Sequence, residues 1–226
     1  MNNYNKKFAP YYDKYWNHFS VAVFKKFKKD LRNKDVCDIA CGTGNFIKKA
    51  KKITKSIEGV DASRDFINYA KKNNPKVRFE TTNIENWHKE NKYNLVVCFY
   101  DSVNHFNNWS KAFKNIFKSL KNNGKFIFDI NTIKGFKKWD GEYTYKTNKG
   151  KIIMNGNTIS RRSAKMNITI TDSENQILSK LEVFEKTYSI KEVKKMLKLA
   201  GFKKIKNLGN VLRPENKNRI FFECTK

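Results

Sequence analysis

The chain has 226 residues, a length that favours one domain with a single sizeable core. Its 39% hydrophobic and 14% aromatic content is typical of a globular protein. No apolar run approaches the roughly 18 residues that a membrane-spanning helix needs, and the first residues lack the apolar core of a signal peptide. We therefore expect a cytoplasmic protein with no membrane partner.

The formal net charge is +27, which could indicate a nucleic-acid partner. However, only seven of the 48 basic residues are arginine, the better reader of phosphates and bases. Lysine is spread along the whole chain, which favours a solvated lysine surface over a nucleic-acid site. The four cysteines form no C-x-x-C pair, so we expect buried reduced thiols and no metal site.

Apolar residues at helical spacing within residues 4–30 predict one or two N-terminal helices. Strands and helices then alternate as far as residue 131. The expected elements are strand 36–40, helix 45–54, strand 56–60, helix 63–73, strand 77–81, strand 94–99, helix 108–120 and strand 125–130. Ser63 is expected to cap the second of these helices. This alternation predicts a parallel sheet with helices on both faces.

The pattern changes in residues 142–188, which alternate polar and apolar side chains and are rich in β-branched residues. Asn155–Gly156 is among the turn signals, so we expect antiparallel strands in this region. No linker is long enough to divide the chain. The last expected elements are a helix from the cap Ser189 to Gly201 and two closing strands at 203–208 and 219–224.

The segment Asp38-Ile-Ala-Cys-Gly-Thr-Gly44 joins the end of an apolar strand to a glycine turn, and a helix start follows. This geometry lets the backbone approach a nucleotide-like ligand closely. The Asp38 carboxylate would repel a pyrophosphate but suits a ligand with ammonium or hydroxyl donors, and S-adenosylmethionine has both. An NAD site would need glycine at position 47, where Ile47 stands.

Polar residues follow the other predicted strands. Asp61 ends the second strand, roughly 20 residues beyond the glycine turn, where an acid can bind ribose hydroxyls. Asn83–Ile84 follows the third strand, where an adenine edge could be read. Tyr100 and Asp129 stand at the ends of the fourth and fifth strands. Because ligands of parallel sheets bind at the carboxyl ends of the strands, these residues and Asp38 together predict one cofactor site.

The order of these motifs resembles the class I S-adenosylmethionine-dependent methyltransferases across roughly residues 8–226. The glycine motif, Asp61 and Ser119–Phe128 are similar to motifs of that family, and Phe99–Asn104 resembles a bacterial small-molecule group within it. The resemblance implies an α/β, Rossmann-like fold with a mostly parallel seven-stranded sheet and helices on both faces. The implied cofactor is S-adenosylmethionine, and the product is S-adenosylhomocysteine.

The resemblance also implies one methyltransferase domain over residues 1–226. Within it, residues 1–30 are expected to form a helical lid whose tyrosine closes over the cofactor. Residues 135–186 are expected to form an antiparallel, strand-rich insertion after the fifth strand that covers the substrate.

We assign expected site residues on the motifs and the resemblance together. The expected cofactor-binding residues are Tyr11, Trp16, Asp38, Ala40, Gly42, Gly44, Asp61, Ala62, Asn83, Ile84 and Tyr100. The expected acceptor-binding residues are Asp101, Asn104, Trp139, Tyr143, Tyr145 and Tyr188, although the aromatic ones could instead form the inner face of a sheet. Three positions depart from the family pattern: Asn83 replaces an acid, His105 an aromatic residue and Phe184 a histidine.

His105 is the candidate general base, because it follows the fourth strand near the expected methyl position and its ordinary pKa of about 6.5 suits that role. A structural histidine is the alternative. Asp140, Glu142 and Glu182 could orient a cationic amine, although solvated carboxylates are the favoured interpretation.

We predict methyl transfer to nitrogen or oxygen of a small-molecule acceptor. The alternatives are an RNA-modifying methyltransferase, which the charge favours, and a cofactor-binding regulatory protein without catalysis. No sequence feature specifies an oligomeric state.

Overall fold

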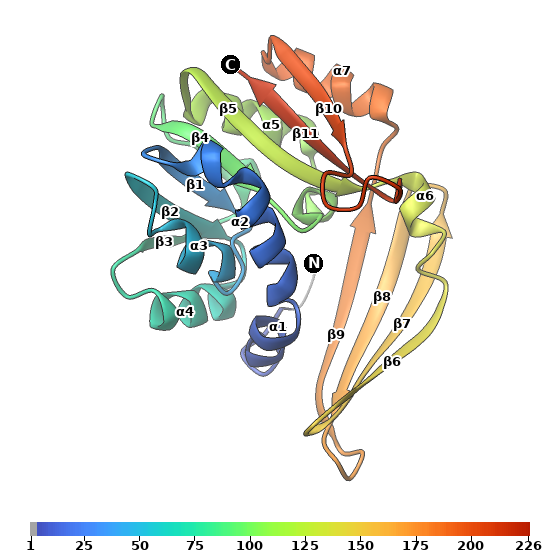
Figure 1. Cartoon of the computed structure of the whole chain (residues 1–226). Coiled ribbons are helices and arrows are strands. Elements are labelled where there is room, and N and C mark those ends of the chain that lie inside the picture. The colour runs from blue at the N-terminus through green and yellow to red at the C-terminus, as the bar shows by residue number, and fades with distance from the viewer. Residues whose placement is uncertain (1–3) are drawn as a thin grey trace.

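The computed structural model describes residues 4–226, so the first three residues of the expected lid lie outside it. It contains a seven-stranded sheet, the helices that cover it and a separate four-stranded sheet (Figure 1). Up to the fifth strand the elements are α1 (Ala9–Tyr15), α2 (Asn17–Leu31), β1 (Asp35–Ile39), α3 (Asn45–Ala50), β2 (Ser56–Asp61), α4 (Arg64–Asn73), β3 (Arg78–Thr81), η1 (Ile84–Asn86), β4 (Tyr93–Cys98), η2 (Ser102–His105), α5 (Trp109–Ser119) and β5 (Leu120–Asn131). The remaining elements are α6 (Ile133–Phe136), β6 (Gly141–Thr147), β7 (Gly150–Ser160), β8 (Ser163–Thr171), β9 (Ile177–Lys186), α7 (Ile190–Ala200), β10 (Lys204–Gly209) and β11 (Arg219–Thr225).

The large sheet has the strand order β10-β11-β5-β4-β1-β2-β3. Strands β1 to β5 pair in parallel, whereas β11 runs antiparallel to both β5 and β10. The predicted Rossmann-like, mostly parallel sheet and its closing hairpin are therefore confirmed. Strand β1 lies between β2 and β4, so the strand order reverses there. A ligand crevice forms at such a reversal, outside the carboxyl ends of the strands.

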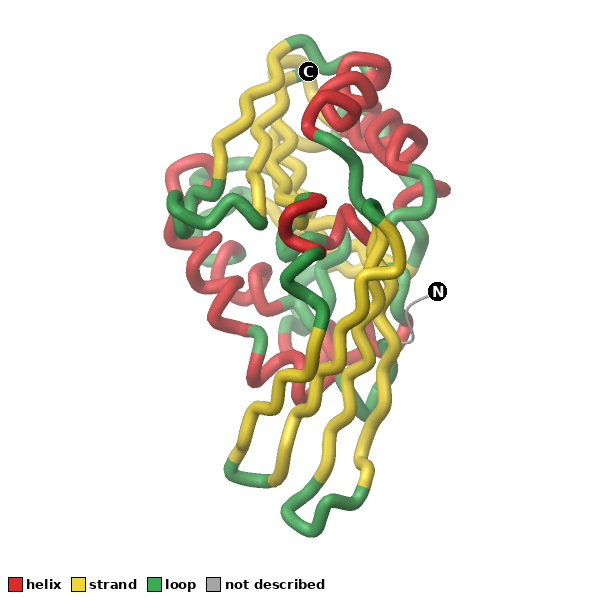
Figure 2. The backbone as a smooth tube through the Cα atoms, turned by 90° about the vertical axis from the view of Figure 1, so that its right-hand side faces the viewer, coloured by secondary structure: helices red, strands yellow, loops and turns green. Residues whose placement is uncertain are grey.

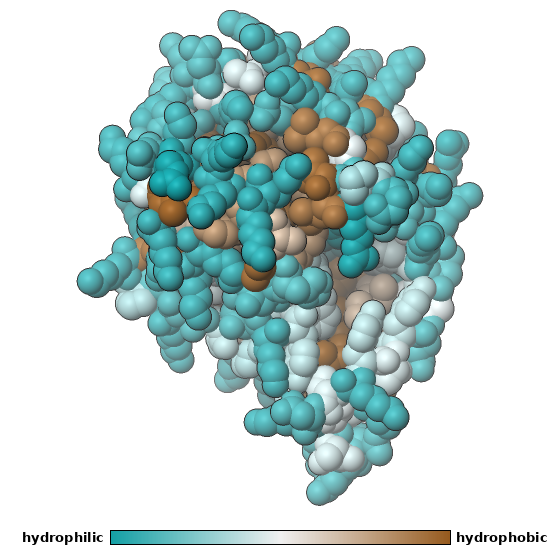
Figure 3. Space-filling model, in the orientation of Figure 1, coloured by the Kyte–Doolittle hydropathy of each residue, from teal (hydrophilic) through white to brown (hydrophobic). Residues whose placement is uncertain are grey.

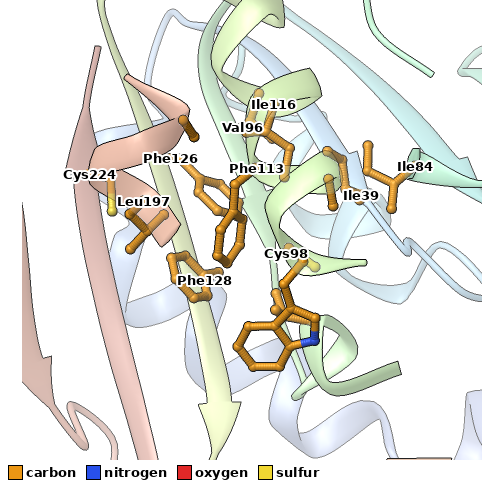
Figure 4. Packing of buried hydrophobic residues seen from close by; sticks show 14 of the residues in the cluster. Ile39, Ile84, Val96, Cys98, Phe113, Ile116, Phe126, Phe128, Leu197 and Cys224 are labelled. Atoms are coloured by element: carbon orange, nitrogen blue, oxygen red, sulfur yellow. The ribbon is translucent and has the colours of Figure 1, made fainter. Parts of the chain in front are cut away.

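Each face of the large sheet is covered by its own set of helices. Helices α2, α3 and α4 pack on one face through apolar residues such as Phe27, Phe46 and Ile67. Helices α5 and α7 pack on the other face, where Phe113 and Leu197 contact the aromatic side chains of β5 (Figure 4). Apolar residues therefore fill both interfaces, as expected of a parallel sheet buried on two sides.

Several helix ends follow from local hydrogen bonds. The Ser63 hydroxyl accepts from the Phe66 N–H at 3.2 Å, so the predicted cap of α4 is confirmed. Ser189 and Glu192 form a reciprocal capping box at the start of α7, and Gly201 ends that helix in the left-handed conformation. By contrast, α3 ends at Ala50 although the sequence predicts helix to residue 54.

Strands β6 to β9 form an antiparallel meander inserted between β5 and α7, and it projects from the body of the molecule (Figure 2). The predicted antiparallel strands are confirmed, but the turn predicted at Asn155–Gly156 is wrong because both residues lie inside β7. A Cβ at Gly156 would lie 1.9 Å from the Trp139 carbonyl oxygen. Glycine is therefore needed there for close backbone approach, and the actual turn is at Arg161–Arg162.

The face of the molecule in Figure 3 is mainly hydrophilic, with apolar side chains showing in its upper part and in the hollow beside the projecting strands. Among residues 4–226, no helix has the length and apolar content that crossing a bilayer would require. Lysine side chains form ion pairs with six acidic residues that are scattered over several elements: Asp30, Asp35, Glu58, Glu80, Glu182 and Glu223.

Candidate active site

A cavity of about 800 Å³ lies at the carboxyl ends of the parallel strands and extends to the four-stranded sheet. Strands β1, β2 and β4 contribute one end of it through the residues that follow them. The other end is lined by side chains of β7, β8 and β9, including Met154, Met166, Ile168 and Val183. The volume is within the range of about 300–1,000 Å³ that is usual for small-molecule sites.

The glycine turn after β1 is held open by Asp61. One carboxylate oxygen of Asp61 accepts from the Gly42 N–H, and the other accepts from the Ser63 N–H, each at 2.8 Å. Gly42 has φ +56°, and a Cβ there would lie 3.4 Å from the Tyr12 ring. Gly44 has φ +78°, and a Cβ there would lie 2.8 Å from the Asn74 amide nitrogen. Both positions therefore favour glycine.

Asp38 is a buried acid beneath this turn, with only 3% of its surface exposed. No donor within residues 4–226 hydrogen-bonds its carboxylate. Burial raises the pKa of Asp38, and the nearby charge of Asp61 raises it further. A cation in the adjoining cavity would stabilise the ionised form of Asp38, so this end of the site suits a positively charged ligand.

A strained turn follows β4 at the centre of the cavity. Tyr100 and Asp101 have φ of +65° and +49°, which non-glycine residues adopt rarely. The Asp129 carboxylate accepts from both of their backbone N–H groups, at 2.8 and 2.9 Å. Arg219 pairs with Asp129 and with Asp101, and its guanidinium lies over the Tyr100 ring. Burial raises the pKa of Asp129 to about 6.

His105 and Glu185 face each other at the acceptor end. His105 ends η2, and Glu185 comes from β9. The distance from His105 Nε2 to Glu185 Oε1 is 3.6 Å. Glu185 also accepts from the Asn131 side-chain amide at 3.1 Å. Burial lowers the pKa of His105 and raises that of Glu185 well above its usual range.

Aromatic side chains of the N-terminal segment close one side of the cavity. Tyr4, Phe8, Tyr12 and Trp16 line it together with Phe66 of α4. The rings of Tyr12 and Trp16 stack at 5.9 Å, and Tyr12 lies 5.2 Å from Phe66. The segment is fixed at its edge by the Ser63 hydroxyl, which donates to the Tyr4 carbonyl oxygen at 2.9 Å.

Comparison with known proteins relates this chain to methyltransferases. A family model described as a methyltransferase domain matches residues 36–124. The whole fold is similar to a crystal structure of an S-adenosylmethionine-dependent methyltransferase from Clostridium acetobutylicum, with a TM-score of 0.79, 23% identity and 97% of each chain covered. Residues 36–124 thus match a methyltransferase domain, and the whole chain has the fold of an S-adenosylmethionine-dependent methyltransferase.

Other relatives of this methyltransferase cover it to different extents. It is 29% identical over 215 residues to an uncharacterized protein of Methanocaldococcus jannaschii, and this match covers 92% of this chain and 78% of that protein. It is 28% identical over 121 residues to the ubiquinone biosynthesis O-methyltransferase of Rickettsia conorii, where the match spans 52% of this chain and 41% of that protein. The fold is also similar to CalS10, an amino pentose methyltransferase from Micromonospora echinaspora, with a TM-score of 0.74, 15% identity and 96% and 94% coverage.

The cofactor of the methyltransferase is S-adenosylmethionine, and the donor set of the cavity fits it. The unpaired carboxylate of Asp38 suits a ligand cation, and Asp61 lines the cavity with lone pairs that remain available for ribose hydroxyls. Gly42 permits close approach of the backbone. When bound, the cofactor supplies an electrophilic methyl group, and the protein supplies alignment and water exclusion.

The structure brings most of the expected site residues to the cavity. Those that line it are Trp16, Ala40, Gly42, Asp61, Ala62, Asn83, Ile84, Tyr100, Asp101, His105 and Trp139. Asp38 lies beneath the wall, and Gly44 faces Asn74 of the neighbouring segment. Tyr12 lines the cavity and lies over the glycine turn, whereas Tyr11, the residue named from the sequence, is outside the lining.

Four expected acceptor residues lie elsewhere. Tyr143 and Tyr145 are 42% and 57% exposed, because β6 is an edge strand at the outer side of its sheet. Tyr188 packs edge-on against Trp109, with the ring centroids 5.0 Å apart. Asn104 is buried, and its amide donates to the carbonyl oxygens of Asn131 and Lys186. None of these four residues is among those that line the cavity.

Sequence reasoning missed Glu185, and strand periodicity contains the signal that would have found it. Leu181, Val183 and Glu185 alternate on the buried side of β9, whereas Glu182 is exposed and pairs with Lys165. Arg219 and Tyr4 were also missed, because only tertiary packing brings the two ends of the chain to the cavity. Asp101, His105 and Glu185 place one potential ligand atom each within 4.8 Å of one another, but Asp101 is already paired with Arg219.

Proposed function

We propose that this methyltransferase transfers the methyl group of S-adenosylmethionine to nitrogen or oxygen of a small molecule. The observation that carries the proposal is a single cavity with two chemically different ends. The end beside β1 and β2 offers Asp61 and Gly42 and suits the cofactor. The end beside β8 and β9 combines apolar side chains with a few convergent polar groups, the usual composition of a small-molecule site.

In this proposal the two segments flanking the cavity act as its covers. The aromatic rings of the N-terminal segment, Tyr12 above all, would close over the cofactor and exclude water. The inner face of β7 to β9, with Trp139 beside it, would hold the acceptor. The similarity to an amino pentose methyltransferase supports a compact acceptor of this kind.

An RNA acceptor is favoured only by the net charge of +27. The centre and the acceptor end of the cavity argue against it, because the carboxylates of Asp101 and Glu185 line it, and the Arg219 guanidinium is already paired with Asp101 and with the buried Asp129. A local excess of negative charge repels phosphate groups. We therefore assign the basic charge to a solvated lysine surface. All four cysteines are free and buried, which supports a cytoplasmic location.

The test is a screen of small-molecule acceptors that measures release of S-adenosylhomocysteine from S-adenosylmethionine. We expect turnover with a restricted set of small acceptors and none with bulk RNA. The Asp61→Ala variant serves as the control for background release. Methylation of RNA with no small acceptor turned over would contradict the proposal.

A further inference from the structure

The cavity-facing side of the four-stranded sheet carries apolar side chains in regular rows. Because β7, β8 and β9 pair antiparallel, their inward residues stand side by side across the three strands. Two neighbouring rows are Gly156, Met166 and Val183, and Met154, Ile168 and Leu181. Four of these side chains line the cavity, and we call them the apolar grid: Met154, Met166, Ile168 and Val183. An acceptor lying on the grid would meet carbon and sulfur atoms.

Polarity on this sheet is confined to the row nearest the cofactor end, where Ala164 pairs with Glu185. Among residues 150–186, all of which the structure describes, Glu185 is the one polar side chain that lines the cavity. The Asn131 amide donates to Glu185 at 3.1 Å and to Asp101 at 2.6 Å, so this row adjoins the turn after β4. Strands β7 and β8 are paired on both sides, so their backbone groups are already hydrogen-bonded.

Aromatic rings of the N-terminal segment line the same space. Phe8 is 1% exposed and belongs to one apolar cluster with Met166, Ile168 and Val183. Two of the four side chains of the apolar grid are methionine. The flexible thioether of methionine adapts to partners of different outline and packs favourably against aromatic rings. This part of the cavity therefore suits an apolar body, aliphatic or aromatic, whose shape can vary.

The rows also set the length of that body. Residues two apart on a strand are separated by about 6.8 Å, so the two steps from the row of Glu185 to the row of Ile168 span about 13 Å. Ile152 and Ile170 form the row after that, and both are buried in the apolar cluster and outside the cavity lining. The apolar part of the cavity thus begins beside one polar row and ends about two steps away.

We propose that the acceptor presents the atom to be methylated on a single polar end and lays an apolar body on the grid. Its substrates are then alkyl or aryl amines, alcohols and phenols, and hydroxyl-rich sugars are excluded. This deepens the proposed small-molecule function and rests on it. Met166 and Val183 determine the specificity, because a sugar hydroxyl pressed on them would lose water without gaining a partner. The similarity to CalS10, at 15% identity, is one of fold and does not require a sugar here.

The first experiment measures kcat/KM of the wild type by release of S-adenosylhomocysteine. Butylamine, hexylamine and octylamine form a chain-length series, and glucosamine is their hydroxyl-rich counterpart. Hexanol, phenol and glucose repeat the comparison for oxygen acceptors. We expect a gain of about fourfold for each methylene that the grid buries. We also expect the apolar acceptors to exceed their sugar counterparts by about 100-fold or more.

The second experiment places one hydroxyl in the grid. Val183→Thr keeps the shape of the side chain and changes its polarity. Val77→Thr is the matched control, because Val77 is also partly buried but precedes β3, outside the cavity lining. We expect Val183→Thr to lower kcat/KM for hexylamine and hexanol by about fourfold or more, while the Kd for S-adenosylmethionine stays unchanged. Val77→Thr should change neither. If Val183→Thr does not fold, Met154→Gln is expected to produce the same fall.

Calorimetric titration of the amine series into the complex with S-adenosylhomocysteine tests the grid without turnover. Sugars turned over as well as the apolar acceptors, no gain with chain length, or equal effects of Val183→Thr and Val77→Thr would overturn the inference and leave the small-molecule function intact. Affinity that rises with chain length but no turnover of any acceptor would support the grid and count against the proposed function. Methylation of RNA alone, with no binding of the amine series, would overturn both.

Discussion

Replacing Asp61 with alanine is expected to weaken cofactor binding far more than it weakens the fold. The change removes the carboxylate that accepts from the Gly42 and Ser63 N–H groups, each at 2.8 Å, and that is proposed to bind the ribose hydroxyls. Hydrogen bonds to a charged group are worth about 1.5–3 kcal/mol each. Losing two ribose contacts should therefore cost about 3–6 kcal/mol, or roughly 10²–10⁴-fold in Kd.

The assay is calorimetric titration with S-adenosylhomocysteine, paired with thermal unfolding. Asp35→Ala is the matched control. Asp35 also accepts two short hydrogen bonds, from Lys121 at 2.7 Å and Ser56 at 2.8 Å, but it lies at the start of β1, away from the carboxyl ends of the strands where the cavity lies. Both variants should lose some stability, and only Asp61→Ala should lose affinity. Equal affinity of wild type and Asp61→Ala would refute the assignment of the ribose site.

Three further outcomes are expected. Gly44→Ala should destabilise the fold more than Gly209→Ala. Both glycines have positive φ, but a Cβ at position 44 would meet Asn74, whereas a Cβ at position 209 would meet nothing within 4 Å. Equal changes in Tm would count against this reasoning. Hydrogen exchange of residues 4–16 should slow on adding S-adenosylhomocysteine, and exchange that is already slow and unchanged would reject the lid. Burial raises the pKa of Asp129 in the folded state to about 6, above its unfolded value near 3.9. Asp129 therefore stabilises the fold below its unfolded pKa, and this contribution is lost as the pH rises through 6. Asp129→Asn should remove this pH-dependent difference of about 2–3 kcal/mol in the free energy of unfolding, which urea unfolding at pH 4 and 7 would measure.

The parts of the fold that local sequence determines were predictable. The alternation of strands and helices in residues 35–131 gave the parallel sheet, and Ser63, Ser189 and Gly201 gave helix ends that the structure confirms. The placement of the cofactor-end residues follows from a general rule, because every parallel strand delivers its carboxyl end to the same edge. Gly42 and Asp61 meet there and hydrogen-bond each other.

The acceptor end depends on tertiary packing and was predictable only in part. Tyr143 and Tyr145 were predicted to line the acceptor pocket because they are aromatic, but nothing in the local sequence shows that β6 is an edge strand on which both are exposed. Glu185 is separated by about 80 residues from His105, and Arg219 by more than 100 from Asp101, so only the assembled sheets bring these charges together. Asn155–Gly156 misled for a similar reason, because the glycine serves a distant backbone contact rather than a turn.

The central claim is that one cavity holds the cofactor at one end and a small acceptor against the four-stranded sheet at the other. Its most direct test is to measure the methyl-transfer kinetics of Trp139→Ala. Tyr145→Ala is its control, because Tyr145 lies near the same sheet but is exposed and outside the cavity. We expect Trp139→Ala to raise the acceptor KM while the Kd for S-adenosylmethionine stays unchanged, and Tyr145→Ala to change neither. Loss of cofactor affinity with normal acceptor kinetics in Trp139→Ala would contradict the two-ended cavity.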